Sequence, residues 1–402
     1  MPLDTGDTSF MLVATALVMI MTPGLAFFYG GLVSRKNVLA IMMQSYVSMG
    51  VSTILWVAVG YSLCFSGDVG GIIGNLDMAF LRGIEPTDLF GGADGTIPLL
   101  LFVAYQMMFA IITPALITGA FANRITFKAY LIFLVAWQIL VYYPFVHMIW
   151  GGGMLAEWGV LDFAGGIVVH ALAGMAALAS VIYVGKRRVE DAGAHNVPFV
   201  AIGAALLWFG WFGFNAGSEL AVDEVTAVAF INTQIAAAFA AITWLLLAWL
   251  YDGKPSFVEL LIGMIAGLAT ITPAAGFVSP QSAMLIGVAA GAVCYFAVVF
   301  RKKKGLDDAL DVWGVHGVGG ALGIVMLGVL ASESIGGQNG LYHGNQDFFM
   351  VQLAGLALAC VWAFAFTYGM LMMIDMITPV RVTDEAEAAL DVTLHGESAY
   401  ID

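Results

Sequence analysis

Charged side chains are scarce in this chain of 402 residues, because Asp, Glu, Lys and Arg together make up only 10% of it. A soluble domain carries about 25% charged residues, whereas 61% of this chain is hydrophobic. The shortage excludes an ordinary soluble protein and predicts an all-α polytopic protein embedded in a lipid bilayer. The few basic residues form only short clusters, so we expect no nucleic-acid partner.

Cysteine is also rare, and the three present, Cys64, Cys294 and Cys360, all fall in apolar segments. Their number and spacing fit neither a disulfide framework nor a metal site. We therefore interpret them as small helix-packing residues and expect no metal and no cofactor. Residues 1–9 contain two Asp and no Lys or Arg, which is the wrong charge for a cleavable signal peptide.

Long apolar runs are the most abundant feature of the chain. A run of about 20 apolar residues is long enough to cross a bilayer as a helix, and we count eleven. The predicted spans are 9–32, 40–66, 98–121, 129–149, 165–184, 198–217, 227–250, 258–275, 282–300, 313–331 and 348–377.

The basic residues predict the orientation of these spans. Lys and Arg collect in cytoplasmic loops, and 13 of the 14 basic residues follow odd-numbered spans or lie in the tail, Arg82 being the exception. We therefore expect the N-terminus outside and the C-terminus in the cytoplasm. We also expect a transmembrane domain over 1–380 and a cytoplasmic tail over 381–402.

Two similar motifs occur in the fifth and tenth predicted spans. Residues 162–170 begin with Asp162 and end with His170, and residues 308–316 begin with Asp308 and end with His316. Each His is preceded by Val and followed four residues later by Gly. Because the two spans enter the membrane from opposite sides, the motifs predict an inverted repeat, 9–184 against 198–331, with the eleventh span left over.

A second pair of matching segments supports this repeat. Residues 110–115 in the third span and 269–274 in the eighth both contain Ile-Thr-Pro-Ala, again five spans apart. Inverted repeats place substrate sites near the middle of the membrane, between the two halves. Eight residues of helix rise about 12 Å, so His170 and His316 can both reach that region.

Ionisable residues inside a membrane are costly and usually functional. Ordinary packing against a carbonyl is the alternative for a single His, and a metal pair is a poor alternative, because neither His has a nearby Cys or carboxylate ligand. Asp162 and Asp308 have the positions of helix N-caps. Capping accounts for most of the role of Asp308, while Asp162 has a second possible role, stabilising a cation outside.

Aromatic residues cluster near the predicted outer ends of spans. Tyr105 and Phe109 lie in the third span, Trp150 ends the fourth, and 208–218 contains Trp208, Trp211 and Phe214. Interfacial Trp is often only a membrane anchor. An aromatic group above two neutral histidines, however, suits a small cation that is attracted by ring faces and can cross the apolar region uncharged.

The chain resembles the ammonium transporter family, which is related to the Rh proteins. The resemblance covers essentially the whole chain and rests on segments with specific sequences. These are 27–31 (FFYGG), 162–174 (DFAGGIVVHALAG), 211–218 (WFGFNAGS), 307–317 (DDALDVWGVHG) and 390–400 (LDVTLHGESAY).

The resemblance implies roles for individual residues. Trp150, Ser218 and Phe109 would recruit ammonium at the outer face, and Phe109 would stack with Phe214 as a gate. Below the gate, His170 and His316 would form a twin-histidine pore lined also by Trp211 and Tyr142. Asp162 would be needed for structure and ammonium handling.

The resemblance also implies a homotrimer with one pore per subunit, and a tail that couples to PII-type signal proteins. The expected activity is selective transport of ammonium and methylammonium across the cytoplasmic membrane, electrogenic if ammonia and a proton cross together. A passive ammonia gas channel and an ammonium sensor with the same fold remain alternatives. An intramembrane enzyme is disfavoured, because no Ser or Cys nucleophile accompanies the two histidines.

Overall fold

The computed structural model describes residues 3–189 and 193–400, so the outermost residues of the two predicted domains, 1–2 and 401–402, lie outside the described residues. Within the described ranges every regular element is a helix, and β-pairing is limited to three isolated bridges. The prediction of an all-α chain is confirmed.

Ten helical stretches in the described residues are long and apolar enough to cross a membrane. Some are divided by short π-helical turns. The stretches are α1 (Thr5–Leu32), α2 (Val38–Leu55) with η1 (Trp56–Gly60) and α3 (Tyr61–Phe65), α4 (Leu99–Ile117), α5 (Phe127–Trp137) with η4 (Gln138–Tyr142), α6 (Tyr143–Trp150) and α7 (Met154–Glu157), η5 (Gly166–Ala171) with α8 (Leu172–Val184), α9 (Val197–Ala216) with η6 (Gly217–Glu219), α10 (Glu224–Asp252), α12 (Pro280–Lys303), η7 (Trp313–Gly317) with α13 (Val318–Leu330), and α15 (Gln346–Asp375).

The predicted span 258–275 corresponds to a shorter helix, α11 (Phe257–Ile271), of 15 residues. Beyond Ile271 the chain continues in turns up to residue 277. Pro273 lies in this segment, and proline cannot donate the backbone hydrogen bond that would continue the helix. The length of α11 alone therefore does not establish an eleventh crossing.

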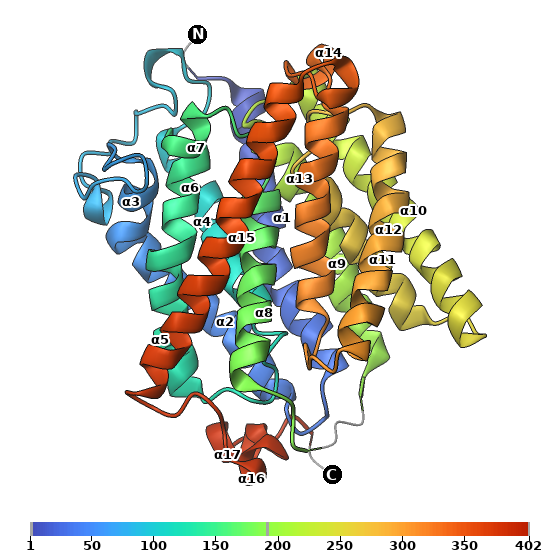
Figure 1. Cartoon of the computed structure of the whole chain (residues 1–402). Coiled ribbons are helices and arrows are strands. Elements are labelled where there is room, and N and C mark those ends of the chain that lie inside the picture. The colour runs from blue at the N-terminus through green and yellow to red at the C-terminus, as the bar shows by residue number, and fades with distance from the viewer. Residues whose placement is uncertain (1–2, 190–192, 401–402) are drawn as a thin grey trace.

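The shorter elements lie at the two ends of the helix bundle. Figure 1 shows the N-terminus and α14 (Glu333–Gly336) at one end, with α16 (Asp384–Glu387) and α17 (Leu390–His395) beneath the other. The remaining short turns are η2 (Ala79–Leu81), η3 (Gly92–Asp94) and η8 (Leu341–His343).

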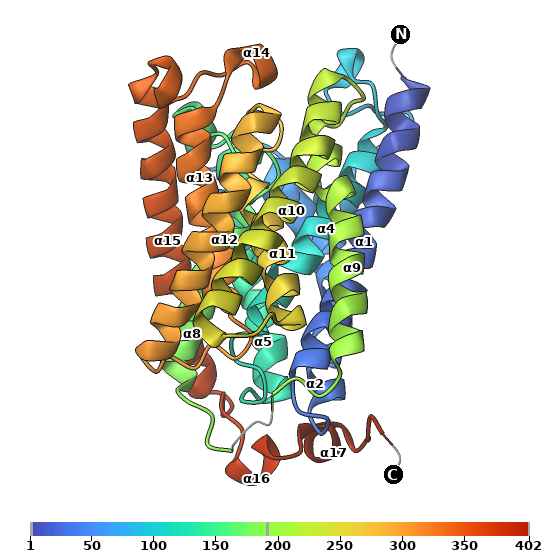
Figure 2. The same cartoon turned by 90° about the vertical axis from the view of Figure 1, so that its right-hand side faces the viewer.

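The long helices pack in a pattern that surrounds η5 and η7. α1 runs along α9 (Figure 2), α10 packs against α11 and α12, and α15 packs against α8. η5 and η7 contact each other and both contact α11. η5 also continues directly into α8, and η7 into α13. Each π-helical turn is therefore held both by its own helix and by the elements packed against it.

Glycines allow the two histidine segments to approach closely. A Cβ on Gly174 would lie 2.0 Å from the Cα of Gly317, and a Cβ on Gly320 would lie 2.6 Å from the carbonyl oxygen of Gly166. Both distances are impossible for a real side chain, so backbone meets backbone at these points. The glycine that lies four residues after each His therefore allows the two histidine segments to come together.

Candidate functional site

The two motif histidines meet inside the bundle. His170 lies on η5 and His316 on η7, and their Nδ1 atoms are 3.2 Å apart. Their rings are nearly parallel, with centroids 5.2 Å apart. In such a contact one nitrogen donates and the other accepts, so the two imidazoles share a single hydrogen between their Nδ1 atoms. Nε2 of His170 is buried without a partner among the described residues.

Both histidines line a small inner cavity of about 20 Å³. A volume of 10–15 Å³ on this measure holds one water-sized molecule. Apart from the two imidazoles and two other polar-tipped rings, the walls are aliphatic and aromatic. The lining residues are Met21, Leu25, Phe28, Tyr29, Ile112, Leu116, Val169, His170, Leu207, Trp211, Phe214, Ile265 and His316. The cavity suits a small neutral molecule better than a hydrated ion.

Aromatic rings form a continuous series from the histidines toward one end of the bundle. Phe214 lies 6.0 Å from His170, ring centroid to centroid, and Phe109 lies 4.4 Å from Phe214. Trp150 follows, 6.0 Å from Phe109 and nearly perpendicular to it. Phe109 and Phe214 are almost completely buried, so the two phenylalanines close the path between Trp150 and His170.

Trp211 forms part of the same wall. Its indole lies 5.5 Å from the His170 ring, and its Nε1 donates to Thr272 Oγ1 over 2.9 Å. Thr272 belongs to the turns that follow α11. The irregular backbone after α11 thus anchors a residue of the inner cavity.

Asp162 connects the outer and inner parts of the site. Its two carboxylate oxygens accept four backbone N–H groups, those of residues 165–168, over 2.6–3.0 Å. These groups form the start of η5, which carries His170. The carbonyl oxygen of Asp162 accepts from Trp150 Nε1 over 2.8 Å. One residue therefore positions both the outermost ring and the first histidine segment.

Asp308 has the corresponding place before His316, with fewer contacts. One of its carboxylate oxygens accepts the Trp313 N–H over 2.7 Å, while the other is buried without a partner among the described residues. Burial, with the nearby charge of Asp311, raises the pKa of Asp308 to about 6.

Ser218 lies beside the outermost rings. Its hydroxyl donates to the carbonyl oxygen of Phe214 over 2.9 Å and lies 3.2 Å from the hydroxyl of Tyr105. Tyr105 in turn donates to the carbonyl oxygen of Gly213 over 2.8 Å. Because the Ser218 hydrogen is used inside the protein, its lone pairs remain available to accept from a ligand.

Two open cavities, of about 500 and 270 Å³, lie on the Trp150 side of the phenylalanine pair. We call them together the outer vestibule, defined by the four residues common to both: Ile149, Trp150, Phe163 and Ser218. Phe109 lines the smaller cavity, and Asp162 and Glu219 line the larger one. Trp150, Phe109 and Ser218, which were predicted to act together, therefore face one space.

Tyr142 lies apart from the other predicted site residues. It belongs to η4, is fully buried, and stacks on Trp137 with ring centroids 6.3 Å apart. It does not line the inner cavity or the outer vestibule. Its place in the pore stays a prediction from the resemblance.

Sequence reasoning missed several residues of the site. Phe163 lines both parts of the outer vestibule, and Tyr29 lines the inner cavity. Both lie inside quoted motifs, directly after Asp162 and within 27–31, so their positions were a usable signal. Thr272 had no such signal, because its role depends on where the chain turns after α11.

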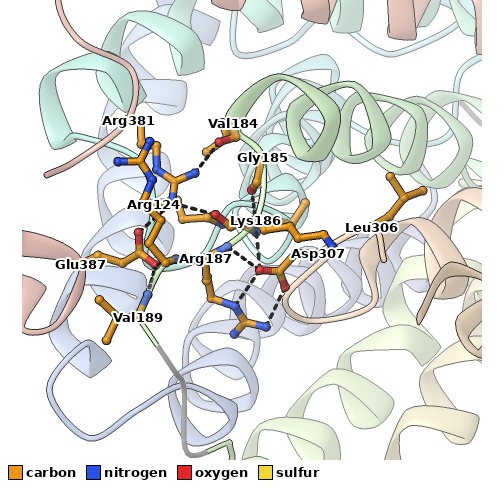
Figure 3. Close-up of polar contacts among 12 residues, drawn as sticks. Arg124, Val184, Gly185, Lys186, Arg187, Val189, Leu306, Asp307, Arg381 and Glu387 are labelled. Atoms are coloured by element: carbon orange, nitrogen blue, oxygen red, sulfur yellow. Dashed lines mark hydrogen bonds and ion pairs between the residues drawn. The ribbon is translucent and has the colours of Figure 1, made fainter. Parts of the chain in front are cut away.

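The tail is held against the loops at the opposite end of the bundle (Figure 3). Glu387 Oε1 accepts the backbone N–H groups of Arg188 and Val189, and Oε2 accepts from Arg381. Arg381 also donates to the carbonyl oxygens of Val184 and Lys186. These contacts connect the tail to the loop that follows α8.

The same loop is tied to the segment that precedes η7. Arg187 donates to both carboxylate oxygens of Asp307, and Arg124 lies 3.5 Å from it (Figure 3). Burial acts to raise the pKa of Asp307, but the Arg187 hydrogen bonds and the Arg124 charge hold that pKa below its usual value. A chain of polar contacts thus runs from the tail to the element that carries His316.

The ten long apolar stretches in the described residues are typical of a multi-pass membrane protein. A model of the Ammonium Transporter Family matches residues 9–400. The ammonium transporter of Bacillus subtilis (strain 168) is 45% identical over 407 residues, covering 100% of both chains. The chain belongs to the ammonium transporter family.

Solved structures agree with this membership. The crystal structure of Candida albicans Mep2 has a TM-score of 0.88 at 35% identity, covering 96% of this chain and 88% of that one. A structure described as a sensor Amt protein has a TM-score of 0.89 at 29% identity, covering 97% and 98%. The predicted family is confirmed, and its relatives include both transporters and a sensor.

Proposed function

We propose that this protein transports ammonium across the cytoplasmic membrane, with ammonia and a proton passing separately through the inner cavity. The relatives named as ammonium transporters support this activity. The observation that carries the mechanism is the unbroken ring series from Trp150 to the His170–His316 pair.

Recruitment would take place in the outer vestibule. A cation over an aromatic face gains about 2 kcal/mol when desolvated, and Trp150 and Phe109 offer such faces. Ser218 adds a hydroxyl whose lone pairs can accept from the N–H groups of ammonium. Methylammonium keeps three of these N–H groups and would bind in the same way.

Release of a proton would follow at the phenylalanine pair. An unpaired ion costs tens of kcal/mol in an apolar medium in the Born limit, and the inner cavity has room for about one small molecule. Ammonia can cross such a space, and potassium cannot lose its charge to do so. The proton would pass through the imidazole pair, which makes transport electrogenic.

Currents across proteoliposomes in an ammonium gradient test this mechanism. We expect ammonium and methylammonium currents from the wild type and none from potassium. His170→Leu and His316→Leu should abolish the ammonium current or remove selectivity against potassium. His343→Leu, at an exposed position in η8, is the control. Selective currents of wild-type size in both pore variants would contradict the histidine role.

A passive ammonia gas channel is the first alternative, and the same vesicles distinguish it. A gas channel would change the internal pH in step with ammonia entry while carrying no current. Intact ammonium-dependent flux without current would replace the electrogenic mechanism with this one.

A sensor is the second alternative, supported by the similarity to the sensor Amt protein. The ordered contacts between tail and loops offer a route by which occupancy could be reported. A sensor would bind ammonium and change hydrogen exchange in the tail with negligible flux, whereas a transporter would show flux of many ions per chain.

We also propose eleven crossings, arranged as an inverted repeat of five plus five, with the N-terminus outside. The termini lie at opposite ends of the bundle (Figure 1), as an odd number of crossings requires, with α11 and its following turns as the eighth. Labelling of single cysteines at Asp94 and Lys254 with an impermeant reagent tests the orientation. Asp94→Cys should react from outside and Lys254→Cys only after permeabilisation.

Assembly and regulation rest on the family resemblance. We propose a homotrimer and a regulatory tail over 381–402 that couples to a PII-type protein at the cytoplasmic face. Native mass spectrometry of the purified protein checks the first proposal, with a monomer in mild detergent as the contrary result. Co-purification of a PII protein with the full chain, but not after removal of residues 381–402, checks the second.

A further inference from the structure

We infer that Glu219 is a cation-attracting residue of the outer vestibule, which sets the affinity for ammonium together with Ser218. This inference rests on the proposed transport function and names an additional residue for it. Glu219 follows Ser218 directly on η6, and both line the larger cavity with Trp150. Its carboxylate therefore belongs to the same space as the proposed recruitment residues.

The two carboxylates that line this cavity differ in how their oxygens are used. Asp162 accepts four backbone N–H groups with its carboxylate. For Glu219, no side-chain hydrogen bond or ion pair occurs within residues 3–189 and 193–400. The Asp162 charge is thus largely satisfied by the start of η5, and the Glu219 charge is available to a ligand.

Two neighbouring acidic residues have structural partners instead. Asp223 caps α10 by accepting the Thr226 N–H, and Asp7 accepts the Val222 N–H over 2.9 Å. Glu219 has no such duty in the described residues and is only partly exposed. The charge of Asp223 repels that of Glu219, so a bound cation would relieve an unfavourable interaction.

A carboxylate in a partly enclosed, apolar-walled space concentrates cations there. This attraction acts on ammonium in the outer vestibule, before any proton is released. It therefore favours entry into the vestibule without changing the barrier that a bound ammonium ion must cross. Removing it should raise the half-saturating concentration and leave the maximal rate unchanged. Salt should weaken the effect, because the Debye length falls from about 30 Å at 0.01 M to about 8 Å at 0.15 M.

The experiment compares ammonium titrations of proteoliposome currents for wild type, Glu219→Gln and Glu219→Asp at low and high concentrations of a bulky organic salt. We expect Glu219→Gln to raise the half-saturating concentration roughly threefold to tenfold at low salt. The shift should shrink at high salt, and Glu219→Asp should largely restore the wild-type value. The maximal current should stay the same in all three.

Glu157→Gln is the matched control, since Glu157 is an exposed carboxylate on α7 that lines neither part of the outer vestibule. An equal shift in Glu157→Gln would show a general surface-charge effect and overturn the inference. So would a Glu219→Gln titration that matches wild type at both salt concentrations. A wild-type chain that moves no ammonium at all would overturn the proposed function as well.

Discussion

At the scale of single residues, the two motif aspartates show how the same side chain is used to different degrees. Asp162 binds four backbone N–H groups at the start of η5, while Asp308 binds the Trp313 N–H and leaves one oxygen unpaired. Hydrogen bonds to a charged group contribute about 1.5–3 kcal/mol each. The structural requirement for a carboxylate is therefore much stronger at residue 162.

Asp162→Asn should destabilise the protein, because an amide oxygen can accept only part of the four N–H groups and the amide nitrogen would face the others. We expect a loss of about 2–4 kcal/mol and loss of ammonium current. Thermal unfolding in detergent measures the first and proteoliposomes the second. Asp308→Asn at pH 7 is the comparison and should cost clearly less. Equal melting temperatures for Asp162→Asn and wild type would contradict the capping role.

Asp308 should make stability depend on pH. Its pKa is raised to about 6 in the folded chain from about 3.9 when unfolded. A raised carboxyl pKa gives a contribution that is complete below the unfolded value and is lost as pH rises through the folded value. Wild type should therefore lose stability between pH 4 and 6.5 relative to Asp308→Asn, by up to ~3 kcal/mol.

Unfolding curves of both proteins across this range measure the difference. The difference in stability between the two proteins is the informative quantity, because other groups near Asp308 also affect each curve. These groups are Asp311, Arg301, Arg124 and Tyr29. Parallel pH profiles would contradict the assignment to Asp308.

His170 and His316 line the inner cavity, while Trp150 and Ser218 line the outer vestibule. Ionisable and aromatic side chains in apolar runs stand out in a sequence, which is why these residues were predicted, and their roles in transport stay predictions. Glu219 was missed, although it follows Ser218, because one acidic residue at a span end is common. Whether its oxygens are occupied depends on contacts that sequence spacing does not reveal.

At the scale of elements, the close contact between Gly174 and Gly317 decides how closely the two histidine segments approach. Gly174→Ala would place a Cβ 2.0 Å from the Cα of Gly317, so α8 and η7 would have to separate. We expect a lower melting temperature, by at least several degrees, and a strongly reduced ammonium current. Overpacking of this kind typically costs 1–3 kcal/mol.

Gly369→Ala is the control for this substitution. Gly369 lies on α15, and a Cβ there would meet nothing within 4 Å. Alanine favours a helix over glycine by about 1 kcal/mol, so this variant should be as stable as wild type or slightly more so. A Gly174→Ala protein with wild-type stability and current would show that the close crossing is not required.

Helix positions followed from the sequence more reliably than helix type. Apolar length predicted the apolar helices to within a few residues at most ends, α11 included, although α11 is too short to establish a crossing by its length alone. The π-helical turns η1, η4, η5 and η7 were not predicted, because a π turn uses the same apolar residues as an α turn. Such turns are frequent at functional sites, and here η5 and η7 carry the two histidines.

At the scale of the whole molecule, the tail is an ordered part of the cytoplasm-side surface in the proposed orientation. Glu387 is the central contact, since it accepts from two backbone N–H groups and from Arg381. The acidic residues Asp384, Glu385 and Glu387 would also fit a disordered tail. Composition could not distinguish an ordered from a disordered tail, because two of these contacts come from residues almost 200 positions away.

Glu387→Ala should release the tail from the loop that follows α8, because it leaves three donors without their acceptor. We expect amide hydrogen exchange at Arg188 and Val189 to speed up at least ~10-fold, which corresponds to about 1.4 kcal/mol. Hydrogen-exchange mass spectrometry measures this. Glu385→Ala, at an exposed neighbouring carboxylate, should leave exchange unchanged. Identical exchange in both variants would contradict the anchoring role.

The contact between the two Nδ1 atoms has a direction, since one ring donates and the other accepts. A proton that arrives at Nε2 of His170 and leaves from Nε2 of His316 would move the shared hydrogen from the first ring to the second. Both imidazoles would then be in the opposite tautomer, and the pair could not pass a second proton the same way until it was reset. Under this mechanism the return of both rings to their first tautomers, inside a cavity with room for about one molecule, would limit the turnover rate. Heavy water should then lower the maximal ammonium current, and a tenfold excess of ammonium should not restore it.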